Sequence, residues 1–130
     1  MIQVLLIAAG GAIGSVGRYV VAGAFERWLE AAIGAGFPYG TLAVNVIGSA
    51  VLGLVVGLFT SLFESTPELR LFLGVGILGG FTTFSAFSLD AALLWERGEA
   101  LLALLYVAGS VALAIGGLFL GLWTVRVFVA

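Results

Sequence analysis

The chain has 130 residues, of which 62% are hydrophobic and only 9% are charged, whereas soluble domains carry about 25% charged residues. A domain of this size leaves much of its surface exposed, so the composition excludes a water-soluble protein and predicts an integral membrane protein. The net charge of −2 and the absence of lysine give no indication of nucleic-acid binding. The chain also contains no cysteine and no histidine, which excludes disulfides, thiol nucleophiles and histidine-based metal or acid–base sites.

Four apolar stretches are long enough to cross a bilayer, which takes about 20 residues in an α-helix. They cover residues 2–24, 40–62, 69–94 and 100–127, and most charged residues lie between them. Residues 25–33, in the first connection, have the length of a short interfacial helix. The N-terminus has no positively charged segment and no cleavage signal, so we expect the first span to be retained. The prediction is an all-α protein of the inner membrane, with residues 1–130 forming a single transmembrane domain.

Each span contains two glycines four residues apart: Gly10 and Gly14, Gly53 and Gly57, Gly76 and Gly80, and Gly117 and Gly121. This spacing lets helix backbones approach closely in lipid, although glycine is common in membrane helices in general. Because the pair recurs in every span, we expect a tightly packed bundle that oligomerises.

The arginines are almost evenly divided between the two sides of the membrane. If both termini share one side, Arg70 and Arg126 lie there, and Arg18, Arg27 and Arg97 lie on the other. Arginine and lysine bias sets the orientation of a membrane protein. A bias this small permits insertion in both orientations, and therefore an antiparallel homodimer. It does not require dual insertion or a dimer.

Polar side chains follow one face of the second span, because Thr41, Asn45 and Ser49 are four residues apart. Polar groups at membrane depth are costly and are usually functional. The amide of Asn45 can donate to an anion or bridge to another helix, and bridging is the commoner role. Arg18, near the end of the first span, either draws anions into a vestibule or extends to the lipid headgroups.

The third span contains the sequence GGFTTFSAFS at residues 79–88. Adjacent glycines followed by two β-branched threonines disfavour a helix, so we predict a break at residues 79–83, near the membrane centre. Such a break frees carbonyl oxygens, which suit a hard cation, and broken helices often mark ion sites in membrane proteins. Phe84 and Phe87 are three residues apart and share one face of the helix that resumes, where they either pack or line a site.

In the fourth span, Tyr106 and Ser110 are four residues apart and share a face. No Asp, Glu, His or Lys lies deep in any span, whereas a proton-coupled pump needs a buried titratable group. The sequence therefore favours passive conduction or a structural role, and we do not expect an enzyme.

Three motifs resemble those of the Fluc, or CrcB, family of fluoride channels, and the resemblance covers essentially the whole chain. They are GGAIG at residues 10–14 leading to Arg18 and Tyr19, GTLAVN at residues 40–45 with Gly48, and GGFTTFSAFS at residues 79–88. The resemblance implies an antiparallel, dual-topology homodimer of four-helix subunits with two pathways for passive fluoride export. Ala50, Ala86 and Ala114 depart from the usual family pattern.

The resemblance also implies roles for individual residues. A central structural sodium ion, Na+, would be held by the backbone carbonyls of Gly79 and Thr82. The fluoride pathway would be lined by Asn45, Phe84, Phe87, Thr83, Ser85, Tyr106 and Ser110. A phenyl ring has a positive edge, and neutral donors bind an anion weakly enough to release it, as conduction requires.

Two other functions compete with the fluoride channel. A structural membrane subunit would tolerate substitution of Asn45, Phe84 and Phe87 without loss of transport. A small multidrug-type exporter relies on a glutamate in its first membrane helix, and residues 2–24 contain no carboxylate. No phosphate-loop motif is present, so the expected partners are fluoride, a second copy of the chain and the lipid bilayer, with no nucleotide and no nucleic acid.

Overall fold

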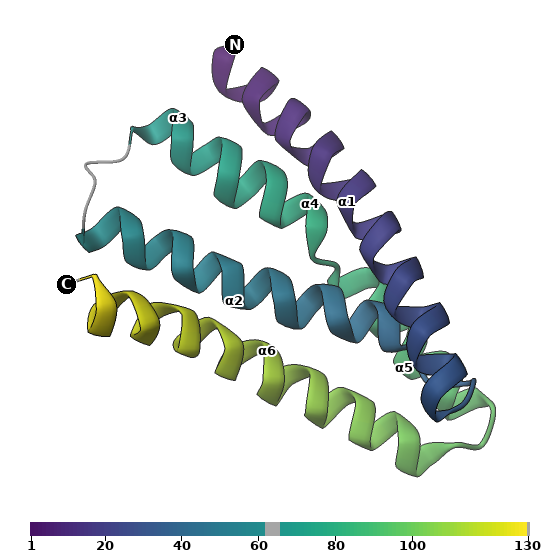
Figure 1. Ribbon diagram of the computed structural model, residues 1–130. Coiled ribbons are helices and arrows are strands. Elements are labelled where there is room, and N and C mark those ends of the chain that lie inside the picture. Colours follow the sequence, from purple (N-terminus) through teal and green to yellow (C-terminus); the bar gives the residue numbers. More distant parts are fainter. Residues whose placement is uncertain (62–65, 130) are drawn as a thin grey trace.

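The computed structural model describes residues 1–61 and 66–129, and within them every regular element is helical. The elements are α1 (Ile2–Ile33), α2 (Tyr39–Ser61), α3 (Pro67–Arg70), η1 (Leu71–Leu78), α4 (Gly79–Phe81), α5 (Phe84–Glu96) and α6 (Ala100–Phe128) (Figure 1). By length and composition, four stretches can cross a membrane: Ile2–Ile33, Tyr39–Ser61, Pro67–Glu96 and Ala100–Phe128. The all-α class and the four predicted spans are confirmed. Leu62, the predicted end of the second span, and Glu64 in the connection after it lie outside the described residues.

The first span is longer than predicted, because residues 25–33 continue α1 to Ile33. Residues 25–33 therefore do not form a separate interfacial helix, although they have the length of one. No glycine or proline interrupts residues 24–33, so nothing in the sequence ends the helix there. The helix ends at Ile33, and the next residue, Gly34, has a φ of 123° that is strained for residues with a side chain.

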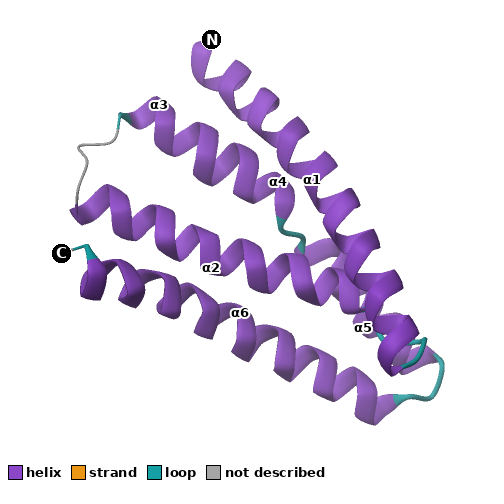
Figure 2. Ribbon diagram, in the orientation of Figure 1, coloured by secondary structure: helices purple, strands orange, loops and turns teal. Residues whose placement is uncertain are grey.

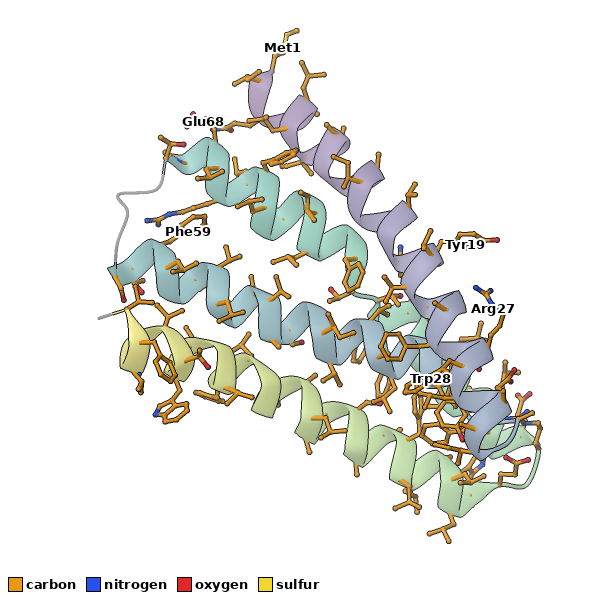
Figure 3. The ribbon with its side chains drawn as sticks, in the orientation of Figure 1. Met1, Tyr19, Arg27, Trp28, Phe59 and Glu68 are labelled. Atoms are coloured by element: carbon orange, nitrogen blue, oxygen red, sulfur yellow. The ribbon has the colours of Figure 1, made fainter. Side chains whose placement is uncertain are left out.

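Figures 1 and 2 show both termini and α3 towards one end of the bundle, with the α1–α2 and α5–α6 turns at the other. The most extensive helix pairs are α2 with α6 and α1 with η1. Arg27 lies towards the turn end of α1, far from Met1 (Figure 3). Both termini therefore lie at one end of the bundle, as the predicted division of the arginines between the two sides of the membrane requires.

The paired glycines allow close contact within the two most extensive helix pairs. A Cβ on Gly14 would collide with the backbone carbonyl of Ile77, and one on Gly53 would collide with that of Leu118. The other six paired glycines also face a neighbouring helix closely. The tight packing that the spacing predicts is therefore present within one chain.

The third span is broken where the sequence predicts it, but the break is narrower than residues 79–83. Gly79 and Gly80 remain helical in α4, whereas Thr82 (φ −83°, ψ 158°) and Thr83 (φ −151°, ψ 115°) are extended. Figure 2 shows this interruption as a short loop between α4 and α5. The β-branched threonines leave the helical conformation, and the glycines do not.

A buried apolar cluster lies at the turn end of the bundle, where α5 packs on α6. The cluster comprises Phe87, Leu94, Ala103 and Tyr106, with Phe37, Leu42 and Ala91 packed against it. Outside the cluster Val44, Leu78 and Val125 are also buried, but many large apolar side chains point outward, as Figure 3 shows along α1 and α6. An apolar exterior is the surface that lipid requires, since the hydrocarbon core offers no partner for polar groups.

Candidate functional site

Asn45 of α2 holds the break in the third span. Its Oδ1 accepts a hydrogen bond from the Thr83 backbone N–H at 2.7 Å, and its Nδ2 donates to the Thr83 carbonyl at 3.0 Å. The side-chain amide thus pairs with both backbone polar groups of one extended residue. Thr83 is only 8% exposed, and buried backbone groups need such partners. Asn45 therefore has the bridging role, which was the commoner of its two possible roles.

The break redirects two backbone N–H groups that a continuous α-helix would use internally. In such a helix, Thr83 N–H would bond the carbonyl of Gly79 and Ala86 N–H would bond that of Thr82. Here Thr83 N–H donates to Asn45, and Ala86 N–H donates to the Thr83 Oγ1 at 3.1 Å. Gly79 and Thr82 thereby lose their regular helical donors, so their carbonyl oxygens can accept another partner.

A cavity of about 420 Å³ lies beside the break, between α2, the third span and α6. Its walls include seven of the predicted site residues: Asn45, Gly79, Thr82, Thr83, Phe84, Phe87 and Ser110. Gly48, Ser49, Leu52, Gly74, Leu78, Val111, Ala114 and Ile115 complete the lining. Among the residues that the structure describes, none with a charged side chain lines it.

Two uncharged donors at this cavity have hydrogen-bonding capacity to spare. Ser110 is 5% exposed, and its Oγ has no hydrogen-bond partner within the described ranges. The Asn45 Nδ2 carries two hydrogens, and only its bond to Thr83 is found in the part of the chain that the structure describes. Buried polar atoms rarely lack partners, so an unpaired hydroxyl in a cavity wall points to a ligand or a water there.

Aromatic rings form a row that leads from the cavity into the core. The ring centroids of Phe84 and Phe87 are 5.3 Å apart, and those of Phe87 and Tyr106 are 5.4 Å apart. Phe37 meets Tyr106 edge-on at 5.5 Å. Phe87 is 8% exposed, whereas Phe84 is 77% exposed although it lines the cavity. The two phenylalanines thus differ in environment despite their shared helix face.

Three predicted site residues do not line the cavity. Tyr106 is 1% exposed and lies behind the Phe87 ring. The Ser85 Oγ lies 3.2 Å from the Thr83 Oγ1, so Ser85 contacts the break without facing the cavity. Arg18 is half-buried on α1 and is absent from the cavity walls.

Two carboxylates for which no sequence pattern predicts a role make hydrogen bonds between helices. Asp90 accepts a hydrogen bond from the Tyr106 hydroxyl at 3.2 Å, and Glu26 accepts one from the Gly40 backbone N–H. Both pairs join different helices. No spacing in the sequence indicates such contacts, although a carboxylate close to an apolar span is a signal that a partner exists.

The described residues contain no group of three or more His, Cys, Asp or Glu side chains placed to hold a metal ion. That finding does not address backbone ligands. The carbonyls of Gly79 and Thr82 are hard oxygen donors without their usual partners, and such donors fit a cation such as sodium.

Comparison with known proteins identifies the family. The family model described as "CrcB-like protein, Camphor Resistance (CrcB)" matches residues 5–122. The chain belongs to the CrcB family. The resemblance seen in the three sequence motifs is therefore confirmed.

Curated members of the CrcB family match over nearly their entire length. A Rhizobium etli protein named fluoride-specific ion channel FluC is 54% identical over 129 residues, which are 99% of this chain and 100% of that protein. A protein of the same name from Rhodospirillum centenum is 49% identical, with 100% of each chain covered. The family and the four spans identify a multi-pass inner-membrane protein. The family is one of ion channels, so the chain is not an enzyme.

Proposed function

We propose that this chain is one subunit of a passive, fluoride-selective channel that exports fluoride from the cytoplasm, with residues 1–130 acting as one transmembrane domain. The observation that carries this proposal is the cavity beside the break, whose walls, in the part of the chain that the structure describes, combine neutral donors and aromatic rings without a charged side chain. The names of the relatives, which match over 99% and 100% of this chain, support it. The membrane potential would drive the anion outward by about 2.3 kcal/mol per charge per 100 mV.

The pathway we propose runs along the residues Asn45, Phe84, Phe87, Thr83, Ser85, Tyr106 and Ser110. The Ser110 hydroxyl, which has no partner among the described residues, and the second Nδ2 hydrogen of Asn45 would donate to fluoride. The phenylalanine rings would present their positive edges. Each such group binds an anion only weakly, and several weak sites in sequence favour conduction over trapping. Arg18 would raise the anion concentration at the entrance.

We also propose that the carbonyls of Gly79 and Thr82 hold a sodium ion. The support is that both carbonyls lose their helical donors, to the side chains of Asn45 and Thr83. A bound sodium ion would satisfy these oxygens and supply positive potential near the anion pathway.

The functional unit we propose is an antiparallel homodimer with two pathways. Phe84 is 77% exposed although it lines the cavity, so one subunit leaves this part of the wall open and a second copy would cover it. The chain contains no cysteine, so one cysteine added in the α5–α6 turn can be labelled selectively in intact cells and in inverted vesicles. Dual topology predicts labelling from both sides, and labelling from one side alone contradicts it.

Ion efflux from liposomes tests the channel directly. Purified protein is reconstituted into liposomes loaded with potassium fluoride or potassium chloride, and valinomycin is added to balance charge. The proposal predicts rapid fluoride release, no chloride release and no requirement for a proton gradient. A folded protein that releases neither ion faster than protein-free liposomes would refute it.

A further inference from the structure

We infer that Glu26 is a positioning residue: its carboxylate caps α2 from the neighbouring helix and thereby holds Asn45 against the break in the third span. This inference rests on the proposed function only where it concerns fluoride flux. Its structural part concerns two contacts made by α2: the hydrogen bond from Gly40 to Glu26 in its first turn, and the pairing of Asn45 with Thr83 five residues later.

The first turn of α2 lacks a capping side chain of its own. Tyr39 is the first helical residue, and Pro38 before it accepts a backbone hydrogen bond from Leu42 N–H at 3.2 Å. A helix start is normally satisfied by a Ser, Thr, Asp or Asn side chain that accepts from the second or third helical N–H. Proline has no such group, so the cap must come from elsewhere.

Glu26 of α1 supplies that cap. Its Oε2 accepts a hydrogen bond from the N–H of Gly40, which is the second residue of α2. A carboxylate at this position also interacts favourably with the positive end of the helix dipole. The bond joins residues 14 positions apart, so it ties α1 to the start of α2.

Close packing of α1 on α2 makes this bond possible. Gly40 is buried, and a Cβ there would lie 2.6 Å from the Ala22 carbonyl oxygen and 3.0 Å from the Glu26 Oε2. The two helices are therefore in backbone contact beside the cap. A side chain at residue 40 would separate them and carry the carboxylate away from the N–H.

The capped turn is close to the contact that holds the break. Asn45 lies five residues after Gly40, or about 7.5 Å further along an α-helix, and both of its amide atoms bond Thr83. Gly48, less than a turn further on, faces the Thr82 side chain so closely that a Cβ would collide with it. The two hydrogen bonds between Asn45 and Thr83 require correct distances at both amide atoms. Fraying or sliding of the first turn of α2 would therefore weaken them.

Glu30 provides a matched control. It lies one turn after Glu26 on α1, and both side chains line a second cavity of about 320 Å³ with Asp90 and Arg97. The Glu30 carboxylate has no hydrogen bond or ion pair to any residue in 1–61 or 66–129. Replacing Glu30 therefore removes a similar charge from the same cavity and leaves the cap intact.

The side-chain amide of Asn45 reports its own position. The chain contains one asparagine and one glutamine, Asn45 and Gln3, so the side-chain amide region of a ¹⁵N-labelled protein contains two NH₂ pairs. We expect Glu26→Ala to shift the Asn45 pair and leave the Gln3 pair in place. Glu26→Gln, whose amide oxygen can accept the same hydrogen bond, should restore the wild-type Asn45 position, and Glu30→Ala should not move it.

Fluoride flux per folded protein is measured on the same variants. Displacement of Asn45 predicts a lower flux per folded protein for Glu26→Ala, rescue by Glu26→Gln, and wild-type flux for Glu30→Ala. A merely structural role would lower thermal stability without changing the flux of the folded fraction. An unmoved Asn45 pair, or wild-type flux in Glu26→Ala, would overturn the inference. If the wild type conducts no fluoride, the proposed function fails, and the Asn45 resonances alone then decide whether Glu26 positions α2.

Discussion

Replacing Asn45 by alanine tests how the break in the third span is held. The change removes the donor to the Thr83 carbonyl, at 3.0 Å, and the acceptor for the Thr83 N–H, at 2.7 Å. Hydrogen bonds between membrane helices contribute about 0.6 kcal/mol on average and up to about 1.7 kcal/mol. A buried backbone group left without a partner adds a penalty of about 1–3 kcal/mol.

Thr83 is 8% exposed, so water reaches the unpaired groups poorly and part of this penalty applies. We therefore expect Asn45→Ala to lower the free energy of unfolding by about 2–3 kcal/mol. The free energy is measured by titrating the purified protein from mild detergent into SDS and following helical content. Ser49→Ala is the control, because Ser49 lies one turn later and lines the same cavity without a hydrogen bond among the described residues. It should cost less than about 0.5 kcal/mol.

An Asn45→Ala protein as stable as the wild type would refute this reasoning. The extended residues would then be held by the packing of α4 and α5 alone. A large loss in Ser49→Ala would also count against it, since the effect would then reflect the cavity wall and not the paired amide.

Three further predictions concern packing, the aromatic rings and the sodium ion. Gly14→Ala should destabilise the protein by about 1–3 kcal/mol in the same SDS titration, because the added Cβ would collide with the Ile77 carbonyl. Gly109→Ala is the control and should not destabilise the protein, because a Cβ on Gly109 would meet nothing within 4 Å. Phe84→Ile and Phe87→Ile should each abolish fluoride efflux from liposomes. Only Phe87→Ile should also lower thermal stability, because Phe87 packs on Tyr106 and is 8% exposed, whereas Phe84 is 77% exposed. Wild-type efflux from either stable variant would contradict the role of the ring edges. Replacing sodium by N-methyl-D-glucamine should lower the melting temperature reversibly, and an unchanged melting temperature would argue against a structural sodium ion.

The broken span illustrates how far local sequence determines the fold. Two glycines and two threonines in a row predict a break within residues 79–83, and the break is there, because these residues are poor helix formers. The pattern does not identify which of them leave the helix. Gly79 and Gly80 stay helical, while Thr82 and Thr83 are extended. Asn45 stabilises the extended conformation from 38 residues away.

The composition and spacing of residues by themselves determined the membrane class, the four spans and the close helix packing. Each depends on length, hydropathy or a local repeat, and lipid requires that the backbone polar groups of a span be satisfied inside the protein, which a helix does for most of its length. The misjudged end of α1 is consistent with this limit, since the charged residues in 25–33 do not stop the helix and no glycine or proline interrupts residues 24–33.

Only the tertiary structure decided which polar groups meet. The Glu26 cap on Gly40, the Asn45 bridge to Thr83 and the unpaired Ser110 hydroxyl in the cavity wall all depend on how separate helices are packed. Apolar helices can slide and rotate against one another at little cost in lipid, since no hydrophobic force fixes them there. Their register is set by close backbone contacts and by a few directional hydrogen bonds, neither of which can be read from one segment alone.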